Sequence, residues 1–151
     1  MAVKASITII GMDEVLRNLS AYGPAVKQAA AAALYEEARA IENESVARYV
    51  PVDTGQLRRD MAFVDEQAQM DGDHVSITFG YHGPYAASVH ENPRAGRTGG
   101  VSPSGKRYRH WATVGVWKFL ETPLLEAENG MLSRLAGRIR DILGGRLAAG
   151  F

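Results

Sequence analysis

The hydrophobic positions in the first third of the chain predict a strand, a short helix and one long helix. Residues 5–10, ASITII, are rich in β-branched side chains and partly alternate, which is typical of a strand. Apolar residues at helical spacing over 12–22 indicate a short helix. From Ala25 to Tyr49, small and apolar residues recur at every third or fourth position without an intervening glycine or proline. This run predicts a helix of about 38 Å.

The long helix is expected to carry one narrow contact face. Its periodic positions are mostly alanine, so a sheet or a second helix can approach closely. Its charged side chains are expected on the other faces; they are Glu36, Glu37, Arg39, Glu42, Glu44 and Arg48.

The middle of the chain has the pattern of a β-hairpin. Residues 58–64 fit either a short helix or the start of a strand. From 74 to 80 the apolar residues fall on alternate positions, and Asp71-Gly-Asp just before them is a turn signal. We therefore expect a hairpin between about 60–68 and 74–81.

A long loop separates two helical segments in the last third. Residues 85–91 read as a short helical stretch, and 92–112 then contain four glycines, two prolines and five basic residues. Loops of this length inside compact domains are usually functional or mobile. In the last helix, Thr122 suits the N-cap and Pro123 the first helical position.

The final helix is predicted to carry apolar residues from Leu125 to Leu143. Gly130 and Gly137 are expected to weaken it by about 1 kcal/mol each relative to alanine. Gly144-Gly145 is expected to end it, which leaves a frayed tail from about residue 144.

Composition predicts a single domain, residues 1–151, and excludes some chemistry. The chain has 46% hydrophobic residues and no cysteine, so disulfides, thiolate metal sites and cysteine nucleophiles are excluded. The first residues, MAVKASITIIGMDE, do not match a signal peptide, and no apolar run approaches the roughly 18 residues of a membrane span. We expect a soluble protein made in the cytoplasm, without a membrane partner.

Charge is balanced overall but unevenly distributed. The formal net charge is zero; residues 1–72 hold 7 basic and 11 acidic side chains, and residues 73–120 hold 6 and 2. A neutral chain is not typical of a free-standing nucleic-acid binder. The asymmetry suits unlike faces that meet in an oligomer or with neighbours, although ordinary solvated faces give the same pattern.

The stretch YVPVDTGQLRR, residues 49–59, predicts a rigid corner. Pro51 ends the long helix, because the residue before a proline avoids the α conformation. Asp53 can cap a following helix and Gln56 can bond back to it, with Thr54 as an alternative cap. Gly55 permits a close approach or an unusual dihedral angle.

Beyond this glycine, Leu57 is expected to pack inward while Arg58 and Arg59 project outward. Asp53-Thr54-Gly55 also occurs in aspartic proteases, but that mechanism needs two carboxylates that share a proton. The triplet occurs once here and follows a long helix rather than an apolar strand. The corner is therefore the preferred interpretation.

The order of motifs resembles the tail-completion, or neck, proteins of long-tailed bacteriophages, a family that includes minor capsid and head–tail joining proteins. A long helix, VPVDTGQLRRDM, an alternating strand, YAASVHE, a variable loop and KFLETPLLEA follow one another over residues 12–143. Many relatives continue the glutamate of the fourth motif with Phe-Gly-Thr, where this chain has Asn92-Pro93-Arg94. The matching residues are Pro51, Asp53, Thr54, Gly55, Leu57, Arg58, Tyr85, Ala86, Val89, Glu91, Phe119, Leu120 and Pro123.

This resemblance implies an α+β fold, with an antiparallel sheet covered by the long helix and the C-terminal helix. It implies a non-enzymatic virion protein, without a cofactor, that forms a ring at the neck, commonly a hexamer. Such a tail terminator caps the tail tube and joins it to the head connector. Its expected partners are its own copies, the tail tube protein, the connector or stopper proteins, and genomic DNA passing non-specifically through the lumen.

The loop 92–112 is the most suggestive functional feature outside these motifs. Basic side chains interleaved with aromatics can follow phosphates and stack on bases. Contact between subunits or partners, contact with DNA in the lumen, and no specific role all fit, and a DNA-binding accessory module is the alternative function. The loop residues concerned are Arg94, Arg97, Lys106, Arg107, Tyr108, Arg109 and Trp111.

The histidines give little support to a third alternative, a metal-dependent hydrolase. His74, His82, His90 and His110 lack the paired spacing of a zinc protease, so no metal site is predicted. His90 and Glu91 are expected to form hydrogen bonds that fix the loop. No phosphate-binding glycine loop is present. Three residues are expected to anchor the last helix to the core: Trp117, Phe119 and Leu120.

Overall fold

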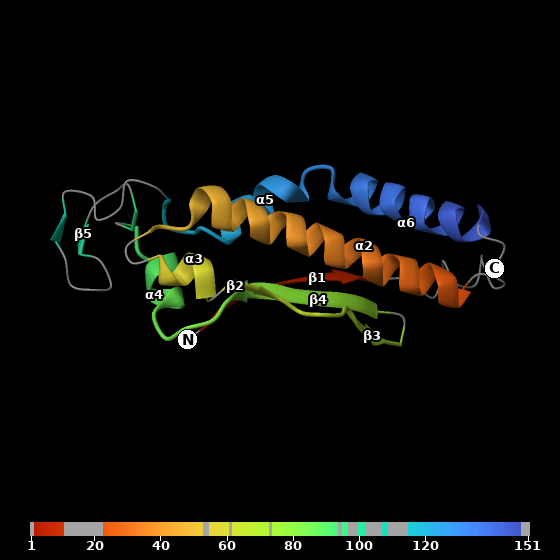
Figure 1. Ribbon diagram of the computed structural model, residues 1–151, viewed down its shortest axis with the longest axis horizontal. Coiled ribbons are helices and arrows are strands. Elements are labelled where there is room, and N and C mark those ends of the chain that lie inside the picture. The colour runs from red at the N-terminus through yellow and green to blue at the C-terminus, as the bar shows by residue number, and fades with distance from the viewer. Residues whose placement is uncertain are drawn as a thin grey trace.

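The chain folds as an antiparallel sheet covered by two layers of helix, which confirms the α+β class (Figure 1). In the computed structural model, α2 (Gly23–Glu44) packs on the sheet with one side and on α6 (Met131–Ala148) with another. The residues that the structure describes are 2–10, 23–52, 55–60, 62–72, 74–93, 95–96, 100–101, 107–108 and 115–148. The helix expected over 12–22 lies outside them.

The strand β4 (His74–Tyr81) is the centre of the sheet. On one side it pairs with β1 (Val3–Ile9), and on the other with β2 (Ala62–Val64) and β3 (Gln69–Asp71), all antiparallel. This confirms the first strand and the predicted hairpin. Residues 58–64, for which the sequence allowed a short helix or the start of a strand, contain both: the helix α3 (Gln56–Asp60) is followed by the strand β2.

The hairpin has an interruption that its sequence pattern does not show. Val64 lies opposite Phe79, whereas Gln69 lies opposite Ser76. The β2–β3 side therefore contains two more residues than β4 over the same stretch, and residues 65–68 bulge out of the ladder.

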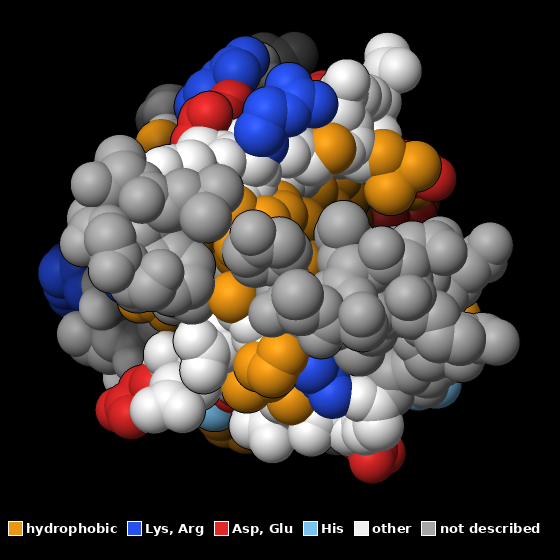
Figure 2. All heavy atoms as spheres, turned by 90° about the vertical axis from the view of Figure 1, so that its right-hand side faces the viewer, with side chains coloured by type: hydrophobic (Ala, Val, Ile, Leu, Met, Phe, Trp, Pro, Cys, Tyr) orange, Lys and Arg blue, Asp and Glu red, His pale blue; other side chains and the backbone are white. Residues whose placement is uncertain are grey.

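The core lies between β4 and α2. Val75, Ile77, Phe79 and Tyr81 alternate along the strand and are all fully buried. The facing side of α2 is mostly alanine with Leu34, and these small side chains let the helix lie close to the sheet. Figure 2 views the molecule end-on and shows hydrophobic side chains at this end, below a group of basic and acidic side chains along the upper edge. Each large apolar side chain buried here contributes about 1.5–3 kcal/mol.

The long helix ends as predicted, but through an unusual last turn. Residues Ser45–Tyr49 form a π-helical turn, in which the Val50 N–H donates to the Ser45 carbonyl at 3.0 Å. Val50 is already extended, with φ −66° and ψ 123°, as expected before Pro51. The turn carries Ser45 into the core, where its hydroxyl donates to the Phe119 carbonyl and accepts from the Tyr81 hydroxyl.

The prediction of one final helix was wrong, because two helices occupy this part of the chain. The first, α5 (Glu121–Glu128), is separated from α6 by Asn129, which is extended, and by Gly130. The Arg134 side chain donates to the carbonyl of Asn129 at 2.9 Å and to that of Ala127, so it satisfies backbone groups freed by the break.

The predicted ends of this region also need correction. The N-cap of α5 is Leu120 and not Thr122, whose N–H already donates to the Lys118 carbonyl. Pro123 does lie in the first turn, where a missing N–H costs little. Gly144 and Gly145 lie inside α6, which continues to Ala148.

Part of the predicted loop 92–112 forms a small sheet. The strands β5 (Gly100–Val101) and β6 (Arg107–Tyr108) pair antiparallel. Within the ranges given above, no helix combines the length and the apolar character that crossing a bilayer requires.

A buried ion cluster joins α2 to α6. The Glu37 side chain is only 2% exposed, although its charge suggested a position on an outer face. Arg134 donates to it from Nε at 3.1 Å and from Nη2, and Arg138 donates to its second oxygen. This three-residue cluster, Glu37–Arg134–Arg138, is called the α2–α6 clasp below.

Replacing Glu37 by glutamine should lower the free energy of unfolding by about 1.5–3 kcal/mol. The amide carries no charge to balance the two arginines, and its NH2 group replaces one of the two oxygens that accept from them. The matched control is Glu36→Gln, which removes a neighbouring carboxylate that is 59% exposed and lies 3.6 Å from Arg138. That change should cost less than about 0.5 kcal/mol. Urea unfolding of both variants tests this, and equal losses would contradict a special role for the clasp.

Candidate interaction site at the loop-bearing end

Those family-matched residues that the structure describes gather at one end of the molecule. The end of α2, α3, α4 (Ala86–His90) and the start of α5 meet there (Figure 1, left). Backbone hydrogen bonds tie the segments together: Val116 N–H donates to the Tyr49 carbonyl at 2.9 Å, and Lys118 N–H to the His90 carbonyl at 2.8 Å. This region, residues 45–60, 85–96 and 115–123, is called the loop-bearing end below.

The predicted corner is present at Pro51 and Gly55. Pro51 is buried, and Gly55 adopts a φ of +81°, an angle that favours glycine. Leu57 is 5% exposed and packs inward, as predicted. Asp53 and Thr54 lie outside the described residues, so their roles as helix caps stay predictions.

Arg58 does not project outward as predicted, although Arg59 is exposed. The Arg58 Nη2 donates to the Val50 carbonyl at 3.4 Å, and its Nε is buried without a hydrogen-bond partner among the described residues. The guanidinium therefore reaches back across the corner to the end of the long helix. The aliphatic part of the side chain packs while the guanidinium donates to a backbone carbonyl, which is common for arginine.

Aromatic contacts hold α4 against the start of α5. Phe119 is fully buried, and its ring meets those of Tyr81 and His90 edge-on, each at a centroid distance of 5.0 Å. Three further family-matched residues of these two segments are buried: Ala86, Val89 and Leu120. These contacts confirm Phe119 and Leu120 as anchors. They place the fourth and last motifs in one packed unit.

Two aromatic side chains of this end lie nearer the surface. The Tyr85 hydroxyl donates to Gln56 Oε1 at 3.4 Å, which links α4 to α3. Trp117 was expected to anchor the helix but is 38% exposed, with the Lys118 ammonium 5.8 Å from its ring centroid. The anchor is therefore Phe119 and Leu120 alone.

An ion network surrounds the predicted His90–Glu91 hydrogen bond, which is confirmed. His90 Nε2 accepts from the Glu121 N–H at 3.4 Å, so Nδ1 carries the proton and donates to Glu91 at 2.7 Å. Lys118 Nζ lies 2.7 Å from Glu91 and 2.9 Å from Glu121. Its hydrogen bond, followed by that of His90, lowers the pKa of Glu91, and the same carboxylate raises the pKa of Lys118.

These residues are also the one group in the described part of the chain with metal-ligand geometry. Ligand atoms of His90, Glu91 and Glu121 lie within 4.8 Å of one another. The Lys118 ammonium already bridges the two carboxylates and neutralises the charge that would attract a cation. The arrangement therefore fits an ion-pair network better than a metal centre.

Both ends of the loop are anchored to the corner. Gly96 forms a β-bridge with Val116, and Ala95 is fully buried. Gly115 has a φ of +80° and touches the corner so closely that a Cβ there would lie 2.3 Å from the Pro51 nitrogen. The loop therefore starts and ends on the packed unit that the motifs build.

The basic and aromatic side chains of the loop cannot be placed on this framework. For Arg107 and Tyr108 the structure gives only the backbone pairing of β6. The remaining predicted loop residues lie outside the described ranges: Arg94, Arg97, Lys106, Arg109 and Trp111. Their roles in contact stay predictions.

Sequence reasoning missed a buried acid beneath the corner. Glu42 is 4% exposed, and neither carboxylate oxygen has a hydrogen-bond partner among the described residues. Burial raises its pKa to about 8, so the side chain is mostly protonated at neutral pH. The pKa of the buried Tyr81 is raised first by its own burial and then by Glu42. Glu42 is one of four glutamates in this alanine-rich helix, and nothing in the sequence distinguishes it as buried.

Comparison with protein-family models, with curated proteins and with solved structures found no match to this chain. The family resemblance therefore rests on the order and placement of the motif residues.

Replacing Gly115 by alanine should destabilise the loop-bearing end, because the added methyl meets the backbone at Pro51. The free energy of unfolding of this variant should fall by about 2 kcal/mol or more. Gly137→Ala is the matched control. That glycine is helical and a Cβ added to it would meet no atom within 4 Å, so the change should raise the free energy of unfolding by at most about 1 kcal/mol. Thermal unfolding of the two variants should move in opposite directions, and a shift in the same direction would contradict the close contact.

The raised pKa of Glu42 predicts that the free energy of unfolding falls as pH rises. Its pKa is about 8 in the folded chain against 4.5 for the free side chain, so between these values unfolding releases a proton. The unfolding free energy should then fall by up to about 1.4 kcal/mol per pH unit in this window.

The variant Glu42→Gln lacks this proton and should show a flatter profile. It should resemble the unaltered chain near pH 5 and exceed its stability near pH 8 by on the order of 2–4 kcal/mol. Urea unfolding at several pH values measures the difference. Parallel profiles for the two proteins would show that Glu42 is not buried as a neutral acid.

Proposed function

We propose that this chain is a structural subunit of a bacteriophage neck that forms a ring at the head–tail junction. In this role it caps the tail tube and joins it to the head connector. The observation that carries the proposal is the meeting of three motifs, around Leu57, Val89 and Phe119, in one packed unit at the loop-bearing end. Motifs that are distant in sequence but share one unit are expected if their order reflects a common fold.

The architecture supports the proposal in a second way. The resemblance implied an antiparallel sheet covered by a long helix and a C-terminal helix. The chain has the sheet under α2, while α6 packs on the other side of α2 rather than on the sheet itself (Figure 1). An α+β fold alone does not specify a function. It is the combination of this architecture with the motif positions that favours a neck protein.

The ionisable groups favour a structural role over catalysis. Glu37 is bound by two arginines, and Glu91 is bound by Lys118 and His90, so both clusters are internally satisfied. Such networks fix elements relative to one another. We accordingly propose a protein without enzymatic activity or cofactor.

The distribution of charge suits assembly with neighbours. Residues 1–72 carry an excess of four acidic side chains and residues 73–120 an equal basic excess. Complementary charge favours association of unlike faces and fixes their register. We propose as partners the chain's own copies in a ring of six, the tail tube protein and the connector or stopper proteins, with genomic DNA passing through the lumen.

A DNA-binding accessory module is the second candidate. The small sheet of β5 and β6 lies at the far tip of the loop-bearing end (Figure 1), in a segment with five basic residues. Such a segment can bind phosphates without reading base sequence. This function would not require a ring.

A variant with glutamine at all five basic loop positions separates these functions. It should remain folded but impair head–tail joining in a phage whose own copy is replaced, measured as the yield of infectious tailed particles. The positions are Arg94, Arg97, Lys106, Arg107 and Arg109. The control carries Lys4→Gln and Arg39→Gln, which remove exposed charges elsewhere.

Mass photometry and negative-stain imaging should show rings of the unaltered chain, alone or on tails. Normal particle yields from the five-site variant would refute a role for the loop. Salt-sensitive DNA binding by a chain that forms no ring would favour the accessory module instead.

A further inference from the structure

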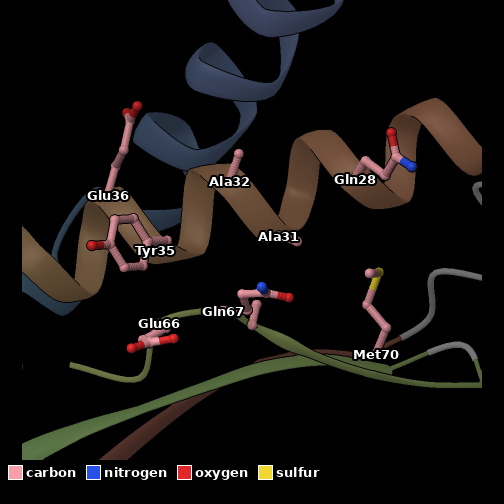
Figure 3. A pocket seen from close by; sticks show the side chains of 9 residues that line it. Gln28, Ala31, Ala32, Tyr35, Glu36, Glu66, Gln67 and Met70 are labelled. Carbon is pink, nitrogen blue, oxygen red and sulfur yellow. The ribbon is translucent and has the colours of Figure 1, made fainter.

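An apolar groove of about 410 Å³ runs between α2 and residues 66–70 (Figure 3). It exists because the bulge at 65–68 leaves the strand ladder, while small side chains on α2 leave space above it. Figure 3 shows Tyr35 and Met70 on opposite sides of the gap, and Met70 is 52% exposed. An exposed methionine beside a hollow of this kind is typical of a contact surface.

The groove has an apolar end and an acidic end. Met70 and Gln28 lie at one end, and Glu66 lies at the other (Figure 3). Glu36 also lines this end, but its carboxylate points away from the gap and lies 3.6 Å from Arg138 of α6. Along α2, Gln28 and Glu36 are eight residues apart, which corresponds to about 12 Å. Within the described residues, Glu66 takes part in no ion pair.

The outer side of α6 carries a stripe with the complementary pattern. Leu132 is 84% exposed, and Ala136 and Arg140 follow at intervals of four residues on the same side of the helix. Arg140 forms no ion pair with any described residue. The stripe thus has an apolar end and a basic end, and its length is also about 12 Å.

The stripe and the groove of one molecule cannot meet, because α2 lies between them. Glu37 faces α6, and Tyr35, two positions away and so on nearly the opposite side of the helix, lines the groove. Two complementary surfaces on different sides of one chain can be satisfied only between copies. Contacts of this head-to-tail kind generate rings when the rotation closes.

We propose that the α6 stripe of one copy docks into the α2 groove of the next copy. Leu132 enters beside Met70, and Arg140 pairs with Glu66 at the acidic end. The match of both ends fixes the direction, so the docked helix runs parallel to α2. This inference rests on the ring proposed above and names the surfaces that close it.

The absence of native cysteine makes the contact directly testable. The double variant Met70→Cys with Leu132→Cys should form a ladder of disulfide-linked oligomers on oxidation, because each copy links to both neighbours. Each single variant should stay monomeric on a non-reducing gel, and a mixture of the two should stop at dimers.

The register is tested with Glu66→Cys in place of Met70→Cys. That position lies at the other end of the groove, away from the proposed seat of Leu132, so the ladder should be lost. All three positions are exposed, and circular dichroism checks that the variants fold. An equal ladder from this control would overturn the proposed direction.

A charge swap gives an independent readout. Glu66→Arg and Arg140→Glu should each reduce ring formation in mass photometry, and the two together should restore it. Failure of the pair to restore rings would overturn the ion pair.

Other outcomes separate this inference from the proposed function. Dimers from Leu132→Cys alone would mean that α6 pairs with itself, which overturns the head-to-tail contact. Rings in micrographs without any ladder would also overturn it, yet leave the neck function standing. A chain that forms no ring even on tails would overturn both.

Discussion

The α2–α6 clasp is the interaction on which the rest of the structure depends. A buried carboxylate costs several kcal/mol unless it is paired, and Glu37 is paired by two arginines of α6. Arg134 also donates to two backbone carbonyls at the α5–α6 break. The clasp therefore fixes the orientation of α5 relative to α6. The start of α5 carries Phe119 to the loop-bearing end, where it closes the core over Tyr81 and His90. One ion cluster therefore sets the position of the surface that presents the loop.

Two buried glutamates of the same helix have opposite consequences. Glu37 is fully bonded and joins two helices, whereas Glu42 has no bonding partner among the described residues and keeps its proton near neutral pH. The first makes the arrangement of helices specific. The second lies under the corner, beside a π-helical turn, in a place where ionisation would oppose packing. Rigid and pH-sensitive regions thus lie within two turns of one another.

Much of the fold could be predicted from the sequence because its signals are periodic. Alternation in β4, alanine spacing in α2 and Pro51 at the corner each act locally and were confirmed. The burial of Glu37 could not be predicted, since it depends on arginines that lie about a hundred residues away in the chain. The helix break was missed for another reason: Gly130 was interpreted as a weak helical position, whereas it adopts a φ of +77°.

The candidate site divides in the same way. The motif residues could be identified in sequence, and the structure brings those it describes together, but the α2 groove depends on a register change between β2 and β3 that no local pattern reveals. The central claim is that the chain works as a ring subunit at the head–tail junction. Electron cryomicroscopy of phage particles that contain the chain tests this most directly. The account predicts density for a ring of copies between tail tube and connector; particles whose neck lacks the chain would contradict it.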